Sequence, residues 1–327
     1  MRVLVLHSDV PPDAPADEQD TLITARAVAE ALRSRGHWAS LAPNVFDPEK
    51  LLSAIAEHRP DMVFNMVEAI FGQGELAPAV PALLEKLTVP YTGCGAAAMA
   101  LAGDKPLSKK VLQLAGLPTP DWHEWPLTQM PSSDARYIVK SATEDASFGL
   151  DAGAVVTGAD AVRQRAQRCR SEYGGRWFAE AYVEGREFNI SVLEEDGEPR
   201  VLPIAEMVFH AWPSERPRIV GYDAKWSEAS PEYSGAERRF HREGTESELH
   251  QRLTGLCKAA WRLFNLRGYA RLDFRVSEAG EPFVLEINPN PGLEPGAGFA
   301  AAAAQAGMSY AEVIEHIVIC ALPNLTR

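Results

Sequence analysis

The chain has 327 residues, of which 46% are hydrophobic and 24% charged, so it is long enough to bury a large core and to form two or three modules. Its 32 basic and 45 acidic side chains leave a net charge of -13, which argues against broad contacts with nucleic acid or anionic lipid. No apolar run is long enough for a membrane span or a secretory signal, and the four cysteines lack Cys-x-x-Cys spacing. These features predict a cytoplasmic protein without nucleic-acid or membrane partners.

The N-terminal part of the chain alternates strand-like and helical patterns. A β-branched and leucine run at 2–6 precedes apolar residues at helical spacing over 22–32, which Gly36 is placed to end. Further strands are predicted at 38–41, 61–64 and 90–93, with a helix at 48–58. Strands that alternate with helices in this way favour a parallel sheet.

Beyond a helix predicted at 104–115, strand patterns follow one another and antiparallel pairing is expected. Strands are predicted at 137–140, 154–156, 177–183, 187–193 and 200–205, the last two separated by the turn signal at 195–197. Residues 208–240 show neither period, which is typical of a functional loop or of disorder, and we interpret them as a lid. Helices are predicted over 249–263 and 299–322.

A hairpin carries the strongest local signal. Residues 269–276 and 282–288 alternate polar and apolar side chains, with a turn between them. If Ala279 and Gly280 form a two-residue loop, Asp273 lies opposite Glu286 and Arg271 opposite Asn288, while one face is wholly apolar. The apolar pairs are Leu272 with Ile287, Phe274 with Leu285 and Val276 with Phe283.

The other face of this hairpin carries Asp273, Glu286 and Asn288 together. Two carboxylates this close repel each other unless a cation or a shared proton lies between them. Three hard oxygen ligands suit Mg²⁺ or Mn²⁺ rather than zinc, they can bridge two ions, and Mg²⁺ usually completes its shell with substrate phosphates. A solvated hairpin face with chance acidic neighbours fits the alternation equally well, but the rigid turn at 288–292 favours the metal site.

Several short motifs follow one another along most of the chain. They are Tyr91-Thr92-Gly93, Asp104-Lys105, Val139-Lys140, Ser147-Phe148-Gly149, AEAYVEGRE at 179–187, Asp223-Ala224-Lys225, ARLDF at 270–274 and LEINPNPG at 285–292. Their order and spacing resemble the ATP-grasp superfamily, and within it the D-alanine–D-alanine ligase group. The resemblance implies an α/β plus α+β fold with three modules: an N-terminal parallel-sheet module at 1–103, a central one at 104–183 and a C-terminal one at 184–327, with ATP between the latter two.

The resemblance also implies a nucleotide site. Lys105 and Lys140 would contact phosphates, Glu180 and the backbone of Val183 would read the adenine edge, and Glu187 would hold the ribose hydroxyls. The complete set that it assigns to ATP is Lys105, Lys140, Ser147, Glu180, Val183, Glu187, Lys225 and Leu285. A single lysine is usually a solvated surface residue, and it is the joint placement of several that favours function.

Three further residues are implied to act on the reacting groups. Lys225, on the lid, would meet the transferred γ-phosphate, while Arg271 and the Gly292 amide would stabilise the oxyanion that forms when an amine attacks an acyl phosphate. The loop at 142–153 would fold over the phosphates. Histidines are expected to be structural or surface residues, since no enzyme nucleophile is needed.

The match fails where the amino-acid substrates would bind. The first serine of the phosphate-loop pair is Ala146, the tyrosine after the lid lysine is Trp226, and Ala297 stands where a serine commonly grips the acceptor carboxylate. Glu68, in a segment that replaces the family's Leu-His-Gly motif, is the candidate for contacting a substrate amino group. The amine-orienting glutamate near the first strand cannot be placed.

The sequence therefore predicts an ATP-dependent carboxylate–amine ligase that forms an amide through an acyl phosphate, uses Mg²⁺ or Mn²⁺ and takes small amino-acid or peptide substrates in a diverged site. Three alternatives stay open: a genuine D-alanine–D-alanine ligase, a ligase that modifies a peptide or protein, and a nucleotide-binding protein without catalysis. The resemblance also implies a homodimer through the N-terminal module.

Overall fold

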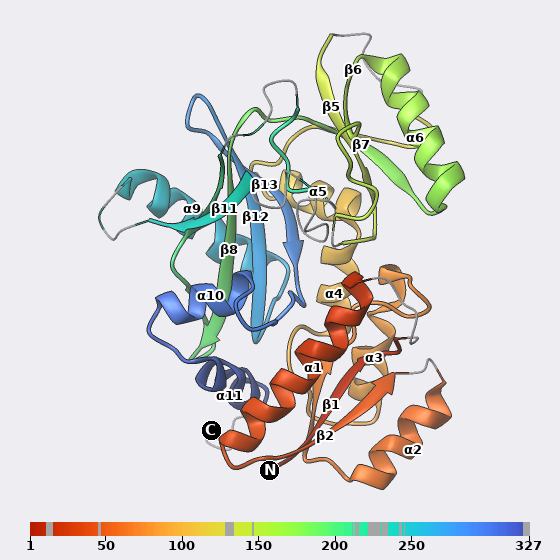
Figure 1. Cartoon of the computed structure of the whole chain (residues 1–327), viewed down its shortest axis with the longest axis vertical. Helices are drawn as coiled ribbons and strands as arrows, with labels where there is room; N and C mark the ends of the chain where they lie inside the picture. Colours follow the sequence, from red (N-terminus) through yellow and green to blue (C-terminus); the bar gives the residue numbers. More distant parts are fainter. Residues whose placement is uncertain are drawn as a thin grey trace.

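The residues that the structure describes form three β-sheets, one parallel and two antiparallel, with helices packed against them (Figure 1). The structure is a computed structural model that describes residues 1–10, 16–44, 47–127, 134–145, 147–210, 212, 216–221, 230, 235–241, 244 and 246–322. None of the described helices combines the length and the apolar character needed to cross a bilayer.

The N-terminal sheet is parallel, with strand order β2-β1-β3, as the alternation of strands and helices predicts. Its part of the chain contains β1 (Arg2–Ser8), α1 (Ala16–Ser34), β2 (Trp38–Asn44), α2 (Pro48–His58), β3 (Met62–Met66), the 3-10 helix η1 (Gly74–Leu76), α3 (Ala79–Lys86) and α4 (Ala96–Gly103). Helix α2 begins as predicted, because Asp47 accepts a hydrogen bond from the Glu49 amide and Pro48 suits the first turn. In place of the fourth strand predicted to end at 90–93, the chain forms a single parallel bridge between Tyr91 and Val63 of β3.

The second sheet is antiparallel and has the order β4-β7-β5-β6. This region contains α5 (Lys105–Leu114), β4 (Trp122–Glu124), β5 (Arg136–Ser141), β6 (Val155–Thr157), α6 (Ala159–Tyr173) and β7 (Trp177–Ala181). Val139 and Trp177 from the sheet pack with Val162 and Ala166 of α6 in one apolar cluster. This packing leaves the opposite face of β5 and β7 free to carry polar side chains.

The third sheet has the order β11-β10-β8-β12-β13, with β9 paired to β8. Its region contains β8 (Gly185–Glu195), β9 (Glu198–Val201), β10 (Ala205–Phe209), β11 (Ala236–Phe240), α9 (Ser247–Leu263), β12 (Tyr269–Ser277), β13 (Pro282–Asn288), α10 (Gly298–Gln305) and α11 (Tyr310–Cys320). The β8–β9 turn is confirmed, since Asp196 and Gly197 both have positive φ, at 53° and 81°.

Two predicted elements in this region are divided in the structure. The strand predicted at 200–205 belongs to β9 and β10, which pair with different parts of β8. The helix predicted over 299–322 is two helices. The chain leaves α10 through Gly307, whose φ is 85°, and the side chain of Ser309 then caps α11 in a capping box with Glu312.

The β12–β13 hairpin turns differently from the prediction. Gly280 has a φ of 81° and the Ser277 amide donates to the Glu281 carbonyl at 2.9 Å, so the loop holds three residues instead of two. The two strands therefore begin one residue out of the predicted register. Val276 pairs with Pro282 and Phe274 with Val284, which corrects two of the three predicted apolar pairs, whereas Leu272 pairs with Ile287 as predicted.

A β-bulge at Leu285 then brings the register back. Its extra residue shifts the pairing between Asp273 and Phe274, so that Asp273 lies opposite Glu286 and Arg271 opposite Asn288, as predicted. Val284 and Ile287 enter the apolar cluster beneath the sheet, whereas Leu285 is only half-buried. The carboxylate pair thus occupies its predicted place through two changes that compensate each other.

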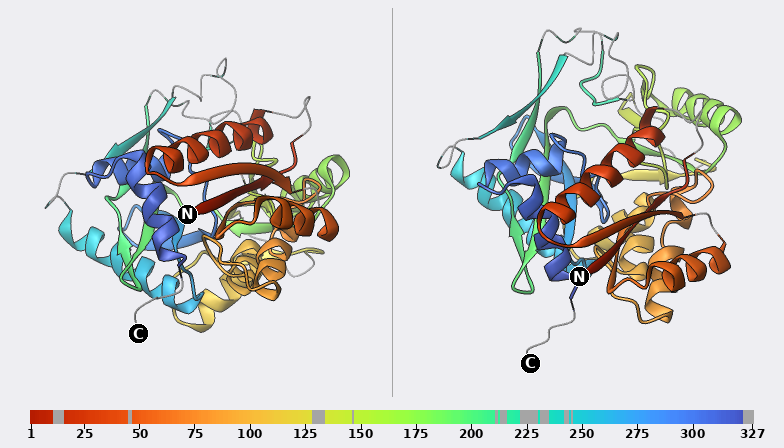
Figure 2. Two further views of the ribbon diagram at one scale, coloured as in Figure 1. Left: turned by 90° about the horizontal axis from the view of Figure 1, so that it is seen from below. Right: turned by 60° about the horizontal axis from the view of Figure 1, so that its bottom comes forward.

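The two ends of the described chain share one core. Val28 and Leu32 of α1 pack with Ile314 and Ile317 of α11, in a cluster that also includes Phe64 of β3. Both views in Figure 2 place α11, in dark blue, beside α1, in red. The C-terminal helix therefore covers a face of the N-terminal sheet, although the two lie at opposite ends of the sequence.

Candidate active site

Asp273, Glu286 and Asn288 converge on one face of the β12–β13 hairpin. The Asn288 amide nitrogen lies 3.4 Å from Asp273 Oδ2 and 3.5 Å from Glu286 Oε1. Asp273 and Asn288 are buried, and the side chain of Glu286 is 23% exposed. The two carboxylates and the Asn288 amide group thus converge on one place. With the amide turned so that its oxygen faces the carboxylates, they form the ligand set that a hard divalent cation prefers.

The carboxylate pair is surrounded by cations. Burial raises the pKa of Asp273. Burial also disfavours ionisation of Glu286, but the positive charges of Lys105, Lys140 and Arg271 outweigh it and lower the pKa of Glu286 to about 2. The site is therefore built to keep at least one carboxylate ionised.

Arg271 lies on the same strand as Asp273 and forms a bidentate ion pair with it. Its Nε and Nη2 atoms donate to the two Asp273 carboxylate oxygens at 2.8 and 2.9 Å, and Nη2 is 4.0 Å from Glu286 Oε1. Residues at positions i and i+2 of a strand share a face, which explains the contact. The sequence prediction places Arg271 beside the reacting groups, and here it lies beside the candidate metal ligands.

The two lysines predicted to bind phosphate reach this site from α5 and β5. Lys105 Nζ lies 2.7 Å from Asp145 Oδ1 and 4.0 Å from Glu286 Oε2, and its side chain is 6% exposed. Lys140 Nζ lies 2.7 Å from Glu180 Oε1. Both ammonium groups are thus held by carboxylates close to where a polyphosphate would lie if the trio bound its metal.

Lys109 belongs to this network, and the sequence interpretation missed it. It is 1% exposed, forms an ion pair with Glu180 Oε2 and donates to Thr119 Oγ1 at 2.8 Å. Burial disfavours the Glu180 carboxylate, yet Lys109 and Lys140 together lower its pKa. Lys109 lies four residues after Lys105, on the same side of α5, and this helical spacing was the available signal.

Glu187 forms an ion pair with Arg275, which the sequence interpretation missed, as it missed Lys109. Arg275, which is 3% exposed, places Nη2 3.1 Å from Glu187 Oε2 and its guanidinium 5.5 Å from the centre of the Tyr182 ring. Arg275 follows Asp273 by two residues and pairs across to Glu187 on β8. Val183 lies in the connection between β7 and β8, next to these groups in sequence.

The loop that contains Ser147 is anchored by its own contacts. The Ser147 hydroxyl donates to the Val220 carbonyl at 2.8 Å, and Arg165 of α6 donates to the Gly149 carbonyl at 2.8 Å. Gly149 has a φ of 66°, and a Cβ built there would lie 2.5 Å from Cη2 of Trp177. The loop is thus held close to the second sheet by a contact that only glycine permits.

Acidic side chains gather on the proposed amino-acid side. Glu68 follows β3 and remains accessible to solvent, but crowding by protein atoms, followed by the charges of Asp145 and Asp20, raises its pKa to about 7. The pKa of Asp20 is raised to about 6, first by burial and then by Glu294. Neither Asp20 nor Glu294 is among the site residues predicted from the sequence.

Arg238 lies next to Ala297, the position at which the family commonly has a serine. Ala297 is the N-cap of α10, and Arg238 on β11 donates to the neighbouring Gly296 carbonyl at 3.2 Å. Burial, followed by the charge of Arg271, lowers the pKa of Arg238. No sequence signal singled out Arg238, because β11 brings it to this place from the far end of the predicted lid.

The remaining predicted residues divide into two groups. Gly292 is open, since a Cβ built there would meet nothing within 4 Å, and Leu285 occupies the bulge of β13. Lys225, Ala146 and Trp226 lie outside the described residues.

Comparisons with known proteins cover nearly the whole chain. Residues 112–319 match the family model described as D-ala D-ala ligase C-terminus. The D-alanine–D-alanine ligase of Desulforudis audaxviator is 32% identical over 310 residues, covering 93% of this chain and 94% of that protein, and the one from Aquifex aeolicus is 27% identical over 325 residues, covering 97% and 100%. The crystal structure of the D-alanine–D-alanine ligase from Bacillus anthracis complexed with ATP superposes with a TM-score of 0.76 at 21% identity, covering 98% of this chain and 97% of that one.

Proposed function

The chain belongs to the D-alanine–D-alanine ligase family and is an ATP-dependent ligase, and from this premise we propose that it joins a substrate carboxylate to an amine through an acyl phosphate. The observation that supports the proposal best is the convergence of Asp273, Glu286 and Asn288 beside Lys105 and Lys140. This donor set fits Mg²⁺ or Mn²⁺, and an ion held there would neutralise the charge of the polyphosphate.

The reaction that we propose has two steps. A carboxylate oxygen of the first substrate bonds to the γ-phosphorus as the bond to ADP breaks, and the product is an acyl phosphate. The amine of the second substrate then bonds to the acyl carbon, loses a proton, and inorganic phosphate leaves. ADP, phosphate and an amide are formed in equal amounts.

The chain contributes charge and position to these steps. Lys105, Lys140 and Lys225 hold the phosphates, and Arg271 with the Gly292 amide stabilises the acyl oxyanion. Arg271 is preorganised by its bidentate contact with Asp273. In this proposal ATP lies between the second sheet, which carries Lys140, and the third, which carries Asp273.

The acceptor site differs from the family pattern in a specific way. Because Ala297 has no hydroxyl, we assign the acceptor carboxylate to Arg238, whose guanidinium lies beside the start of α10 and near a second cation, Arg271. Two guanidinium groups near each other favour an anion between them. Glu68, whose pKa is about 7, is the carboxylate that receives a substrate ammonium group.

A substrate panel tests the proposal. The purified protein is incubated with ATP, Mg²⁺ and pairs of D- and L-amino acids of increasing size, and phosphate release and product mass are measured. We expect ADP and a new amide with an amino acid other than D-alanine as acceptor. Turnover with D-alanine alone would establish the standard ligase instead, and no ATP turnover with any amino acid or peptide would contradict the proposed function.

A further inference from the structure

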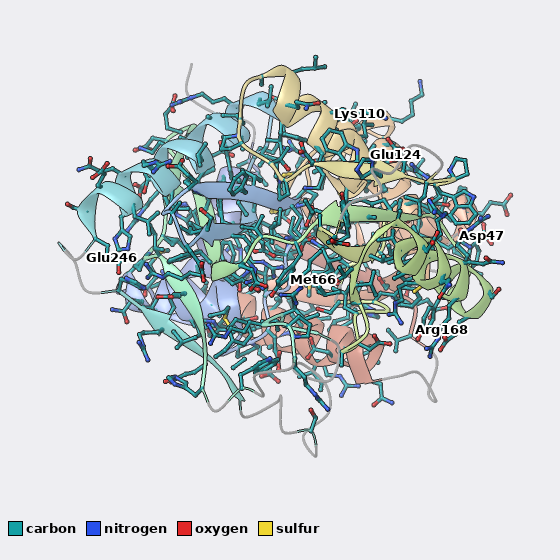
Figure 3. All side chains as sticks on the ribbon, turned by 90° about the horizontal axis from the view of Figure 1, so that it is seen from above. Asp47, Met66, Lys110, Glu124, Arg168 and Glu246 are labelled. Carbon is teal, nitrogen blue, oxygen red and sulfur yellow. The ribbon has the colours of Figure 1, made fainter. Side chains whose placement is uncertain are left out.

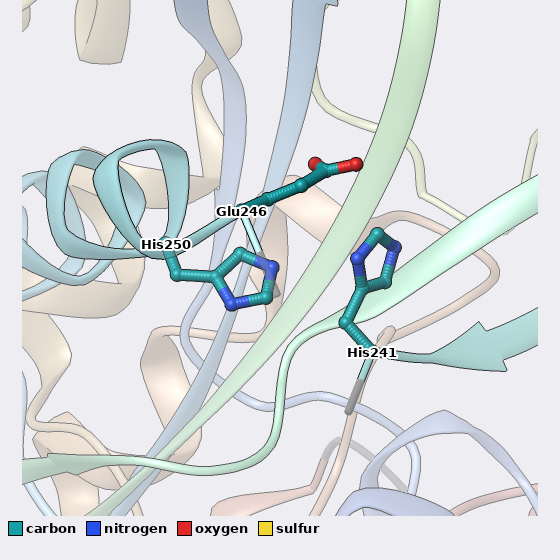
Figure 4. Close-up of side chains that lie close together, drawn as sticks. All are labelled: His241, Glu246 and His250. Carbon is teal, nitrogen blue, oxygen red and sulfur yellow. The ribbon is translucent and has the colours of Figure 1, made fainter. Parts of the chain in front are cut away.

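A second cluster of metal-ligating side chains lies away from the nucleotide site. His241 directly follows β11, while Glu246 and His250 lie at the N-terminal end of α9. Each offers a ligand atom, and these atoms all lie within 4.8 Å of one another. Figure 4 shows the two imidazole rings facing each other with the Glu246 carboxylate beside them, and Figure 3 places Glu246 at an edge of the molecule, away from Met66 at the end of β3.

One ring nitrogen of His250, Nε2, is buried without a hydrogen-bond partner among the described residues. A buried imidazole nitrogen without a partner has lost its hydration without compensation, so a ligand that contacts it is favoured. In Figure 4 one ring nitrogen of His250 faces the ring of His241.

His241 is already oriented as a metal ligand would be. Its Nε2 lies 2.6 Å from Glu206 Oε2, which leaves Nδ1 as the atom available to an ion. Glu206 is fixed in turn by two hydrogen bonds from Arg186, at 2.7 and 2.8 Å. A histidine whose second nitrogen is held by a carboxylate is the usual arrangement around protein-bound zinc.

Glu246 can supply the third ligand. Arg186 Nη1 donates to its Oε2 at 2.7 Å, so the other carboxylate oxygen remains available. With neutral histidines, the charges of Glu206, Glu246 and Arg186 sum to -1, which favours a cation.

We propose that His241, Glu246 and His250 form a binding site for a borderline transition-metal ion such as Zn²⁺. Two imidazoles and one carboxylate are a set that zinc accepts with a fourth position open to water, whereas Mg²⁺ prefers oxygen ligands. Ligand atoms around tetrahedral zinc lie roughly 3.4 Å apart. The ligand atoms of the three side chains therefore need to approach one another by about 1.5 Å or less to bind the ion. The ion would join the end of β11 to the first turns of α9.

Metal binding by the full-length protein tests this site. Chelator-treated protein in buffer without Mg²⁺ or nucleotide is titrated with Zn²⁺ against a chromophoric chelator, and with Co²⁺ while visible absorption is recorded. We expect one tight equivalent of Zn²⁺, and a Co²⁺ spectrum of a low-coordinate site with nitrogen ligands. Glu246→Gln and His250→Ala should each weaken Zn²⁺ binding tenfold or more. Circular dichroism verifies that each variant is folded. Because the Glu246 side chain is exposed, Glu246→Gln should disturb the fold less than His250→Ala.

Two control variants locate the ion. His210, which directly follows β10, forms a comparable pair with Glu237 of β11 at 2.9 Å. It lies outside the cluster, so His210→Ala should leave Zn²⁺ binding unchanged. Glu286→Gln should also leave it unchanged, because Glu286 belongs to the nucleotide site. Equal affinity in wild type, Glu246→Gln and His250→Ala, or a loss confined to Glu286→Gln, would overturn the proposal. Neither result depends on ligase activity.

Discussion

Glu286 lies in the field of Lys105, Lys140 and Arg271, and these three cations stabilise its negative charge. Replacement of Glu286 by glutamine keeps the shape and removes the charge. We expect turnover to fall about 100-fold or more, since metal-assisted charge stabilisation contributes several kcal/mol and each 1.36 kcal/mol is a factor of ten in rate. ADP formation at saturating ATP and amino acids measures the loss.

Glu281→Gln is the matched control for that experiment. Glu281 lies on the same hairpin, but its side chain is 58% exposed and pairs with Arg252 at the surface. We expect normal turnover and an unchanged melting temperature. A Glu286→Gln enzyme as active as this control would count against the assigned metal ligands.

In the proposed acceptor site, Glu68 should make turnover depend on pH. Its pKa is about 7, so the carboxylate that attracts an ammonium group is present above that pH and is lost as the pH falls through it. We expect kcat/KM for the amine substrate to rise between pH 6 and 8 more steeply in wild type than in Glu68→Gln. Parallel profiles would remove Glu68 from the acceptor site, and Glu57→Gln on the exposed side of α2 is the control.

Sequence reasoning placed some site residues better than others. The trio on β12 and β13 could be predicted, because alternation along a hairpin assigns each side chain to a face. Lys109, Arg275 and Arg238 could not be singled out, since their partners come from other strands and their burial arises from packing. Ligand roles of the predicted residues stay predictions until a complex is studied.

At the scale of elements, the β12–β13 hairpin has the predicted pairing of Asp273 with Glu286, although the predicted loop length and the predicted absence of a bulge were both wrong. The pattern does not reveal whether Gly280 sits in a two- or a three-residue loop, because glycine suits both. The bulge at Leu285 has no strong sequence signal either. Since one bulge compensates one extra loop residue, Asp273 still faces Glu286.

The loop at 142–153, which we expect to fold over the phosphates, depends on one close contact. Alanine at Gly149 would need positive φ and would collide with Trp177, so the loop must move away from the second sheet. Backbone strain of about 1–2 kcal/mol corresponds to roughly a tenfold change, and we expect KM for ATP to rise by about that factor while the fold persists. Steady-state kinetics with varied ATP measures it.

Gly153→Ala is the control in the same loop. A Cβ at Gly153 would lie 3.3 Å from the flexible Asp151 carboxylate, and this residue has no positive φ. KM for ATP should therefore change little. If Gly149→Ala behaved in the same way, the position of the loop would not limit nucleotide binding.

At the scale of the whole molecule, α11 ties the last described residues to the first sheet. Ile317 is fully buried in the cluster shared with α1, so Ile317→Ala should lower the free energy of unfolding by about 2–5 kcal/mol. Ile319, on the same helix, is 56% exposed, and Ile319→Ala should change it by less than about 0.5 kcal/mol. Urea denaturation of both variants measures the difference, and equal values would show that α11 contributes little to the core.

The acyl phosphate is the central claim, and the fate of one oxygen atom tests it most directly. When the substrate carboxylate carries ¹⁸O, attack on the γ-phosphorus transfers one labelled oxygen to the phosphate that is later released. We predict that mass spectrometry of inorganic phosphate finds one ¹⁸O for each amide formed. Unlabelled phosphate accompanying amide formation would contradict the account.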